Sequence, residues 1–259
     1  MNSADITFVI LTRNEAANIG ACLASLPASS RSIVYDAMST DRTGDIARSA
    51  GATVVSAPWQ GFRRARGAAA QLVTTPWTFM LDADERISSD LAAQLQGLQP
   101  GPDVGGYSMP RRNHFCGRWI RSAGWWPDRL VRLFRTGKAQ LVARGPSSQG
   151  VHETWHPSGE CLVLSAPIEH YSYTSADGYR RKFALYTDLE ASGARGTLTG
   201  AIGAWLIVPA RFAWYWLRRG GIFEGWRGAF VCAGNAAYPA VVATKSWIRR
   251  GVPRDEATA

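Results

Sequence analysis

The first hundred residues alternate short apolar runs with segments of helical periodicity. The apolar runs have the length of strands buried in a parallel sheet, and they cover residues 7–11, 32–35, 53–56 and 77–81. Each run is followed by a predicted helix, and these helices cover residues 16–26, a segment capped by residues 39–41 and ending at 50, and residues 62–73 and 88–98. This alternation predicts an α/β fold with a doubly wound, mostly parallel central sheet and right-handed crossovers.

The last third of the chain has a different pattern. Residues 179–191 predict a polar helix, residues 201–217 a strongly apolar and aromatic helix, and residues 222–250 a further helix with a basic end. Pro209 and Arg211 interrupt the apolar run, so it falls short of the ~18 apolar residues of a spanning helix. The pattern favours amphipathic helices lying on an anionic membrane surface. The alternative is a helix pair that packs on the rest of the chain.

The composition is that of a globular protein with a sizeable core. The chain has 259 residues, of which 46% are hydrophobic and 19% charged. Its four cysteines lie far apart and form no Cys-x-x-Cys pair, which favours reduced thiols in the cytosol. The apolar run at residues 6–11 is too short for the core of a signal peptide, so we expect a cytoplasmic protein.

Positive charge is concentrated in two regions. Residues 111–144 contain nine Arg or Lys and one acid, and residues 201–259 contain eight Arg or Lys and three acids. This balance suits a polyanionic partner, which could be a nucleotide diphosphate, an anionic lipid surface or nucleic acid. Composition does not choose among these three.

Three acids follow the fourth predicted strand within four residues: Asp82, Asp84 and Glu85. Residues i and i+2 that leave a strand share a face, so the first two carboxylates can approach one hard cation. Mg²⁺ or Mn²⁺ held by one or two carboxylates and completed by phosphate oxygens is the usual arrangement. The alternative is a solvated turn with acids near a helix N-terminus.

Other strands of the same predicted sheet also end in polar residues. The turn at residues 12–15 follows the first strand, and Asp36 ends the second. In a parallel sheet these ends lie on one edge, where ligands bind, and an acid in that position can hydrogen-bond a ribose. The sequence contains neither Gly-x-Gly-x-x-Gly nor a P-loop. We therefore expect metal and arginine to neutralise any phosphate.

Several motifs in this order are similar to those of glycosyltransferase family 2. They are Thr12-Arg13-Asn14-Glu15, Ile33-Val34-Tyr35-Asp36 with Ser39-Thr40-Asp41, and Met80-Leu81-Asp82-Ala83-Asp84-Glu85-Arg86. Later motifs resemble the bacterial branch with lipopolysaccharide core β-glucosyltransferases, and they include Gly124-Trp125-Trp126-Pro127-Asp128, Arg132-Leu133-Phe134, Val151-His152-Glu153 and Gly221-Ile222-Phe223-Glu224-Gly225. The resemblance implies the GT-A nucleotide-sugar-binding fold.

The resemblance also implies roles for individual residues. Four would border the nucleoside: Thr12, Asn14, Glu15 and Asp36. Asp82 would contact the ribose or donor sugar and Asp84 would hold the metal, while Arg66 and Ala83 are expected to complete the donor site. The family usually has Ser-Gly at Ala37-Met38 and Asn at Gly67. Because Met38 has a side chain, we do not expect a positive φ there.

The acceptor side is predicted from aromatic residues and acids after position 110. Sugar rings pack on indole faces, which suggests Trp119, Trp125 and Trp126 as acceptor-binding residues, although each could instead fill core. An inverting transfer needs a base, for which Glu153 is the first choice and Asp128 the second. His152 would reach the metal or the diphosphate.

Together these features predict an inverting, metal-dependent hexosyltransferase. The expected donor is UDP-glucose, and the expected acceptor is a lipopolysaccharide-core or other lipid-linked glycan at the inner leaflet, with no nucleic acid as partner. The predicted organisation is a catalytic domain over residues 1–195, with its nucleotide-sugar half at 1–100 and its acceptor half at 101–195, and a membrane-associating segment over 196–259. The alternative is a non-catalytic basic protein that binds membranes or polyanions. The acids at successive strand ends argue against it, because a polyanion binder has no use for carboxylates at its site.

Overall fold

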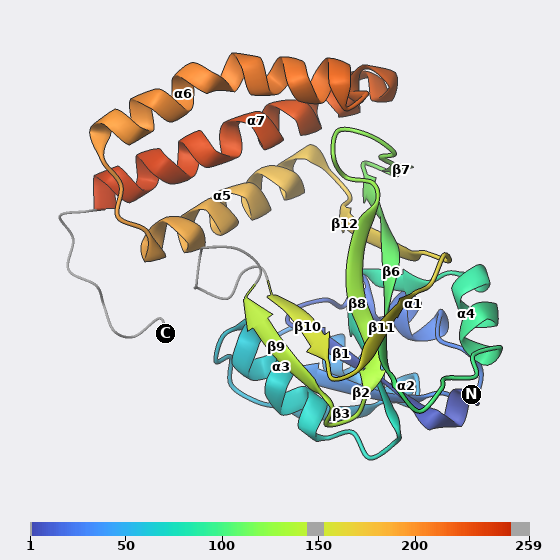
Figure 1. The fold of residues 1–259 in the computed structure, drawn as a ribbon. Helices are drawn as coiled ribbons and strands as arrows, with labels where there is room; N and C mark the ends of the chain where they lie inside the picture. Colours follow the sequence, from blue (N-terminus) through green and yellow to red (C-terminus); the bar gives the residue numbers. More distant parts are fainter. Residues whose placement is uncertain (1, 144–152, 250–259) are drawn as a thin grey trace. The chain divides into compact units, whose positions relative to one another are not determined.

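A computed structural model of the chain describes residues 2–143 and 153–249 (Figure 1). The described residues divide into two compact units. The sheet unit contains the residues up to Arg111, together with Asp128–Val142 and Glu153–His170. The helical unit contains Arg112–Pro127 and the residues from Tyr171 onward. The predicted division into residues 1–195 and 196–259 stays a prediction.

The first half of the sheet unit has the predicted alternation of strands and helices. The strands are β1 (Ile6–Thr12), β2 (Arg31–Asp36), β3 (Thr53–Ser56) and β4 (Trp77–Asp82). The helices are α1 (Ile19–Ala24), α2 (Thr43–Ser49), α3 (Phe62–Gln71) and α4 (Ser89–Gln96), and a short 3-10 turn (Ser3–Asp5) precedes β1. The order β3-β2-β1-β4 is parallel throughout, as the apolar runs predicted.

The remaining strands extend this sheet mainly with antiparallel pairs. They are β5 (Glu85–Ile87), β6 (Val104–Phe115), β7 (Arg118–Trp119), β8 (Asp128–Arg135), β11 (Glu160–Val163) and β12 (Ile168–Tyr173). The sheet continues from β4 in the order β8-β6-β12-β5, and β7 and β11 both pair with β6. A separate two-stranded sheet consists of β9 (Ala139–Ala143) and β10 (Glu153–Pro157). The pairing of β4 with β8 brings residues from the middle of the chain next to the acid-bearing strand end.

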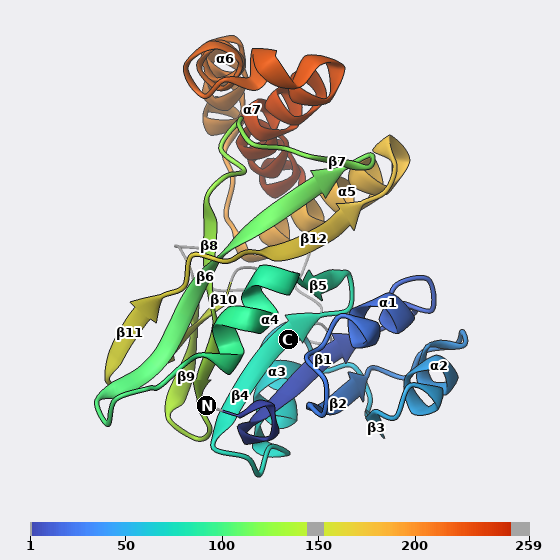
Figure 2. The same cartoon turned by 90° about the vertical axis from the view of Figure 1, so that its right-hand side faces the viewer.

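The central strands are buried on both faces, which explains their continuous apolar sequence. On one face Phe8 of β1 and Phe79 of β4 lie 5.0 Å apart between ring centroids, and Leu91 of α4 joins the same cluster. On the other face Val9 and Met80 pack with residues of α3. Figure 2 shows α3 and α4 on opposite sides of β4. Helices therefore cover both faces, and the doubly wound arrangement is confirmed.

Helix boundaries agree with the sequence to within a few residues, with one wrong assignment at α2. The predicted cap residues were Ser39, Thr40 and Asp41, but α2 follows Arg42, which makes no side-chain cap bond. Ser39 instead donates to the Asp36 carboxylate, and the Thr40 N–H donates to Asn14 Oδ1. Asp41 Oδ1 does accept from the Thr43 N–H at the start of α2, over 3.0 Å, whereas Ser39 and Thr40 bond loop residues and not the helix.

The helical unit contains the three helices predicted for the last third of the chain. They are α5 (Ala176–Gly193), α6 (Leu198–Ala213) and α7 (Gly225–Ile248), with a π-helical turn (Trp214–Arg218) and a 3-10 turn (Gly221–Glu224) between α6 and α7. Phe115, Tyr179 and Val231 share a buried cluster within this unit. Gly234 lets α7 pack closely, since a Cβ there would lie 2.0 Å from the Tyr179 hydroxyl oxygen. Over the part of the chain that is described, no helix combines the length and hydropathy needed to span a membrane.

Candidate active site

The loops that follow β1 and β2 are joined by side-chain hydrogen bonds. Thr12 Oγ1 donates to Asp36 Oδ1 over 3.1 Å, and both residues are buried. The Asn14 N–H donates to Ser39 Oγ over 2.8 Å, and the Glu15 N–H donates to Thr43 Oγ1 over 2.8 Å. The four residues predicted to border a nucleoside therefore lie on two adjoining loops at the carboxyl ends of neighbouring parallel strands. Ligands bind at this edge in open α/β sheets.

The backbone of Met38 corrects one expectation. Its φ is +53°, so this residue takes the left-handed conformation that was not expected for a residue with a side chain. The Met38 side chain is 61% exposed and so meets little steric resistance from neighbours. The loop after β2 therefore has a left-handed residue where the family usually has Gly, at a cost in backbone strain of roughly 1–2 kcal/mol.

The acids after β4 are held by arginines from more distant strands. Arg132 of β8 is 6% exposed and donates through Nη2 to Asp82 Oδ2 at 2.8 Å and to Glu85 Oε1 at 2.6 Å. Arg111 of β6 donates to Glu85 Oε1 at 3.2 Å and through Nη2 to Asp128 Oδ2 at 2.6 Å. The Asp82 N–H also donates to Glu85 Oε2 at 3.0 Å. Glu85 is thus a buried anchor between two arginines.

The network extends from Asp82 in the other direction to the first-choice base. Arg66 of α3 lies 3.5 Å from Asp82 Oδ1 through Nη2 and 3.6 Å from Glu153 Oε2 through Nη1. The predicted donor residues Arg66 and Asp82 therefore lie beside Glu153. We call the connected set the acid–arginine network, and its members are Glu153, Arg66, Asp82, Arg132, Glu85, Arg111 and Asp128.

The network shifts the protonation of its members in opposite directions. Burial raises the pKa of the Asp82 carboxyl, but Arg132 and Arg66 outweigh burial and hold this pKa well below its usual range. Burial lowers the pKa of Arg132, but Glu85 and Asp82 more than reverse that effect. Burial raises the pKa of Glu153, and the nearby arginines Arg66 and Arg63 offset only part of the rise. Asp82 is therefore a fixed negative charge, whereas Glu153 is the more basic carboxylate.

The two candidate bases differ in their surroundings. Asp128 Oδ2 accepts from both Nε and Nη2 of Arg111, at 2.9 and 2.6 Å, so its charge is matched by a two-pronged donor. The Glu153 side chain is 1% exposed, and its Oε2 has no hydrogen-bond partner among the described residues. Because Arg66 approaches this oxygen only to 3.6 Å, Glu153 is better suited than Asp128 to accept a proton. The geometry favours Glu153 over Asp128.

Asp84 lies beside a histidine that the sequence analysis did not identify. His170 of β12 approaches Asp84 Oδ1 to 3.5 Å through Nε2, and both side chains are largely buried. A carboxylate and an imidazole are suitable ligands for Mn²⁺, and a carboxylate alone for Mg²⁺, so the pair fits a cation whose remaining ligands are phosphate oxygens and water. The described residues contain no cluster of three or more His, Cys, Asp or Glu that could hold a metal unaided. His152, the predicted second ligand, lies outside the described residues.

Ala83, between the two aspartates, contributes backbone only. Its side chain is buried, and its carbonyl oxygen accepts from Arg86 Nη1 at 3.0 Å. This bond holds the turn that separates Asp82 from Asp84.

The three tryptophans predicted to bind acceptor all belong to the helical unit, where they have different environments. Trp119 lies between the guanidinium groups of Arg112 and Arg121, at 4.6 and 4.5 Å from its ring centroid, and Trp126 packs edge-on against it. Trp125 packs on Tyr173 at 5.6 Å, and it also lines a cavity. Trp125 therefore packs partly as a core residue would, which was the alternative to acceptor binding. Acceptor binding by the three tryptophans stays a prediction.

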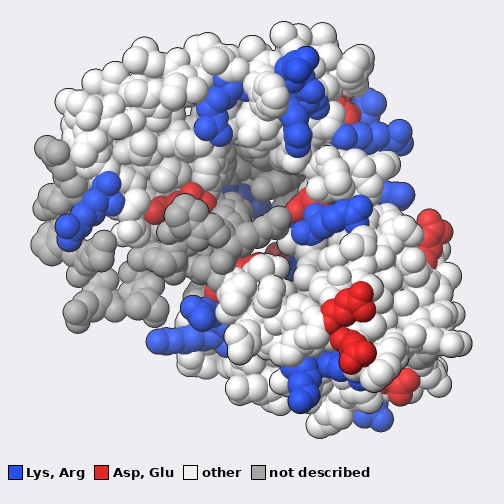
Figure 3. Space-filling model, viewed as in Figure 1, with Lys and Arg blue, Asp and Glu red and all other residues white. Residues whose placement is uncertain are grey.

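The helical unit exposes large apolar side chains along one stretch of chain. Those of α6 include Leu206 at 76% exposure, and Phe223 in the following 3-10 turn is 83% exposed. The others in this stretch are Leu198, Ile202, Trp205, Ile207, Trp214, Leu217, Ile222 and Trp226. Much of the surface over α6 carries no charged side chain, whereas Lys and Arg gather elsewhere on the same face (Figure 3). We call all these side chains, on α6, on the two turns that follow it and at the start of α7, the apolar surface of α6.

Local sequence patterns missed three site residues: Arg132, Arg111 and His170. Each reaches the acids after β4 from a later strand, and the Asp82–Arg132 contact spans 50 residues of sequence. A local signal was present in β8, where Arg132 interrupts the run Leu130-Val131-Arg132-Leu133-Phe134. An arginine inside an apolar strand must be paired if it is buried.

Comparisons with known proteins find several relatives of this chain. The family model described as Glycosyl transferase family 2 matches residues 7–156. A lipopolysaccharide core biosynthesis glycosyltransferase, LpsC of Rhizobium meliloti, is 32% identical over 189 residues, which cover 70% of this chain and 68% of the relative. An uncharacterized glycosyltransferase of Rickettsia felis is 36% identical over 204 residues, covering 72% of this chain and 69% of the relative.

We give one example of a solved structure that shares the fold. It is the mannosyltransferase PcManGT from Pyrobaculum calidifontis in complex with GDP-Man and Mn²⁺, with a TM-score of 0.53 and 15% sequence identity. The alignment covers 93% of this chain and 86% of that one. At this identity the likeness concerns the fold alone.

Proposed function

Because the chain belongs to glycosyltransferase family 2 and has the GT-A fold, we propose that it transfers a hexose from a nucleotide diphosphate sugar to a glycan of the lipopolysaccharide-core type, with inversion at the anomeric carbon. The acid–arginine network is the observation that carries this proposal, since it links the end of the donor-side strand to a basic carboxylate. The relative LpsC, a lipopolysaccharide core biosynthesis glycosyltransferase, supports the acceptor class.

The donor would bind across the joined loops and the end of β4. Thr12, Asn14, Glu15 and Asp36 offer polar groups for the nucleoside, and UDP-glucose is the donor we propose. Asp82 would accept from a hydroxyl of the ribose or of the donor sugar. This role as a hydrogen-bond acceptor is consistent with a carboxyl group that stays ionised between two arginines.

A divalent cation, Mg²⁺ or Mn²⁺, would be held by Asp84 and by His170, which lies beside it. His152 stays a predicted further ligand. When bound, such an ion neutralises charge that develops on the departing diphosphate. The PcManGT structure contains Mn²⁺, which supports a cation in this family's fold. Asp84 fits this role because its carboxylate and the nearby His170 imidazole are both suitable ligands for a divalent cation.

Glu153 would act as the general base. Its carboxylate accepts the proton of the acceptor hydroxyl while the acceptor oxygen bonds to the anomeric carbon. The bond from that carbon to the diphosphate oxygen breaks on the opposite face, which inverts the configuration. Arg66 connects this carboxylate to Asp82, so it would position Glu153 relative to the donor.

The first experiment is a panel of nucleotide sugars with Mg²⁺ or Mn²⁺, scored for donor hydrolysis and for thermal shift. Glu153→Gln should lower turnover by about 10²- to 10⁴-fold and leave donor affinity nearly unchanged, because it keeps the shape and loses the proton acceptor. Glu160→Gln, an exposed glutamate of β11, is the matched control. If Glu153→Gln stays active and Asp128→Asn does not, the base is Asp128.

We further propose that the apolar surface of α6 brings the enzyme to the inner leaflet, where a lipid-linked acceptor would be found. Exposed leucine and tryptophan at this density suit an interfacial helix, and arginine near anionic lipid adds about 1 kcal/mol per side chain. Leu206→Glu should reduce sedimentation with anionic vesicles, whereas the same change at Leu185, an exposed leucine of α5, should not. Binding should weaken with salt but persist, since apolar burial is not screened.

Protein that remains in the supernatant with anionic vesicles at low salt would contradict membrane association. Vesicle binding without hydrolysis of any donor would instead favour the alternative of a non-catalytic basic binding protein.

A further inference from the structure

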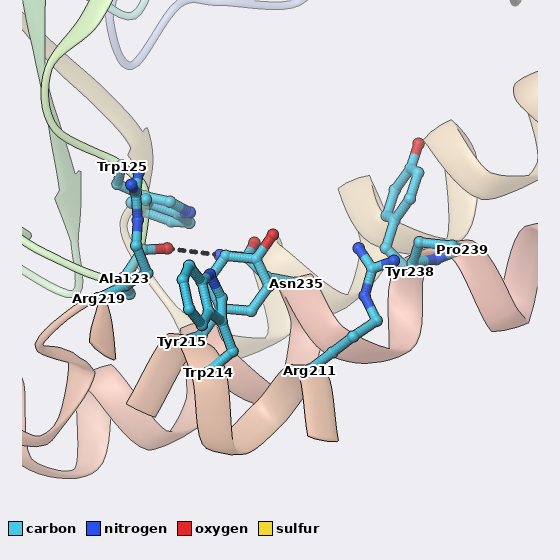
Figure 4. Close-up of a pocket in the computed structure, with 10 residues that line it drawn as sticks. Ala123, Trp125, Arg211, Trp214, Tyr215, Arg219, Asn235, Tyr238 and Pro239 are labelled. Carbon is cyan, nitrogen blue, oxygen red and sulfur yellow. Dashed lines mark hydrogen bonds between the residues drawn. The ribbon is translucent and has the colours of Figure 1, made fainter. Parts of the chain in front are cut away.

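A cavity of about 430 Å³ lies wholly within the helical unit (Figure 4). Its lining comes from the loop at residues 123–125, the end of α6, the π-helical turn and α7. This volume lies within the roughly 300–1,000 Å³ of small-molecule sites. None of its lining residues belongs to the acid–arginine network or to the loops proposed to hold the donor.

Two arginines line this cavity without an acid to match them. Arg211 has a buried Nε that finds no hydrogen-bond partner among the described residues, and Arg219 lies close enough that a Cβ on Gly124 would be 3.7 Å from its Nη2. Neither arginine forms an ion pair within the described ranges 2–143 and 153–249. A buried guanidinium N–H left without an acceptor is costly, and an anionic oxygen would satisfy it.

Another lining residue, Tyr238, bonds a carboxylate that is not itself part of the lining. Tyr238 donates its hydroxyl hydrogen to Glu190 Oε1 over 2.9 Å, so that proton points to the acid. Burial, followed by the bond to Glu190, raises the pKa of Tyr238, which keeps the hydroxyl neutral. The cavity therefore presents two cations and no free acid among its lining residues.

Flat aromatic surface lies beside the arginines. Trp125, Trp214 and Tyr215 line the cavity, and Trp214 is 53% exposed. The last two come from the π-helical turn, a rare conformation that occurs often at functional sites. Figure 4 draws both side chains among the residues that line the cavity. Aromatic faces next to donors suit the C–H face and hydroxyl groups of a sugar ring.

The wall of the cavity is fixed in place by hydrogen bonds. Asn235 Nδ2 donates to the Ala123 carbonyl oxygen over 2.9 Å, and the Ala123 N–H donates to the Arg219 carbonyl oxygen over 2.8 Å. Pro239 of α7 has no N–H, so it cannot donate the helical bond to the carbonyl of Asn235. The site is therefore organised before any ligand binds.

From these observations we propose that this cavity binds a sugar that carries a carboxylate or phosphate group. The proposal rests on the proposed transfer to a glycan acceptor, and it adds that this acceptor is anionic. Arg211 or Arg219 would hold the anionic group while Trp214 or Tyr215 packs on the ring.

The test is direct binding to the full-length protein without any nucleotide sugar. Calorimetry or ligand-observed NMR would compare glucuronate and glucose 6-phosphate with glucose, which is uncharged. Both anionic sugars should bind at least about tenfold more tightly than glucose, and Arg211→Gln should remove about tenfold of that affinity. Arg195→Gln makes the same charge change at an exposed position of the helical unit and should have no effect. Arg219→Gln gives a second variant if Arg211→Gln does not fold.

Equal binding of glucose and glucuronate, or unchanged affinity in folded Arg211→Gln and Arg219→Gln, would overturn the proposal. A lipid headgroup is the other source of such an anion. If anionic sugars fail to bind and Arg211→Gln reduces binding to phosphatidylglycerol vesicles more than Arg195→Gln does, the occupant is a lipid phosphate and the sugar assignment is wrong. Donor hydrolysis by the wild-type protein is measured separately. Its presence without sugar-acid binding would refute this site only, and its absence would refute the proposed function only.

Discussion

Arg132 should be among the most costly charges to remove from the sheet unit. It is 6% exposed, and one of its nitrogens contacts both Asp82 and Glu85 within 2.8 Å. In Arg132→Met the apolar stem remains and the charge is lost. The negative charges of Asp82 and Glu85 would then be balanced only by more distant arginines. Arg66 reaches Asp82 at 3.5 Å, and Arg111 reaches Glu85 at 3.2 Å.

The size of the effect follows from the cost of an unpaired buried charge. Breaking a buried ion pair by removing one partner costs about 3–5 kcal/mol. A chain of this size changes Tm by ~2–4 °C per kcal/mol, so the expected loss is about 6–20 °C. The assay is thermal unfolding by circular dichroism near pH 7.5. Arg129→Met, an exposed arginine on the same strand β8, should change Tm by about 2 °C or less.

The pH dependence gives a second check on the cause. The folded pKa of Asp82 is held below the unfolded value, so its contribution to stability is present above the unfolded pKa of about 4 and is lost as pH falls through the folded pKa. In Arg132→Met this contribution is absent, and burial favours the protonated form of the Asp82 carboxyl. The difference in Tm between wild type and Arg132→Met should therefore narrow below about pH 4.

Two outcomes would refute this reasoning. One is an Arg132→Met protein whose Tm lies within about 2 °C of Arg129→Met, which would mean that solvent compensates the acids. The other is a Tm difference that does not change with pH. If Arg132→Met fails to fold, Arg132→Lys can replace it. Lysine keeps the positive charge but lacks the planar guanidinium, so Arg132→Lys should lose less stability than Arg132→Met.

Three further predictions use the same structure. Asp84→Ala should abolish metal-stimulated donor binding and leave the fold intact, with the exposed Asp103→Ala as control; wild-type metal dependence in Asp84→Ala would exclude this ligand. Met38→Gly should leave stability unchanged or raise it by up to about 1 kcal/mol in chemical denaturation, because Gly tolerates the φ of +53° there, and a clear loss would contradict backbone strain. Glu153→Gln should raise Tm at neutral pH, because the raised pKa marks a charge that destabilises the folded state; the gain should disappear below about pH 4, where glutamate is protonated in both states.

The N-terminal half of the sheet was predictable because its signals are local. Residues 7–11 and 77–81 are apolar on both faces, as strands covered by helices must be, and the structure places them as neighbours β1 and β4. The polar turns that follow them share an edge for the same reason. The contacts between the turns, such as Asn14 with Thr40, could not be derived, since each depends on the exact fold of two loops.

The second half was less predictable because its pairing is not sequential. β8 inserts between β4 and β6, and β12 pairs with β5, so residues far apart in sequence meet around Glu85. No periodicity in β8 indicates that Arg132 will lie against Asp82. His170 likewise reaches Asp84 only because β12 returns to this edge.

The structure changes the explanation for the acids after β4. In the sequence, three acids within four residues favoured a cation that the first two, Asp82 and Asp84, could approach. Two of the three, Asp82 and Glu85, are compensated by arginines of the protein itself. The cation proposed above therefore concerns Asp84, which lies beside His170. It follows that the arginines keep the strand end ordered whether or not metal is bound, so metal removal should weaken donor binding without unfolding the sheet unit.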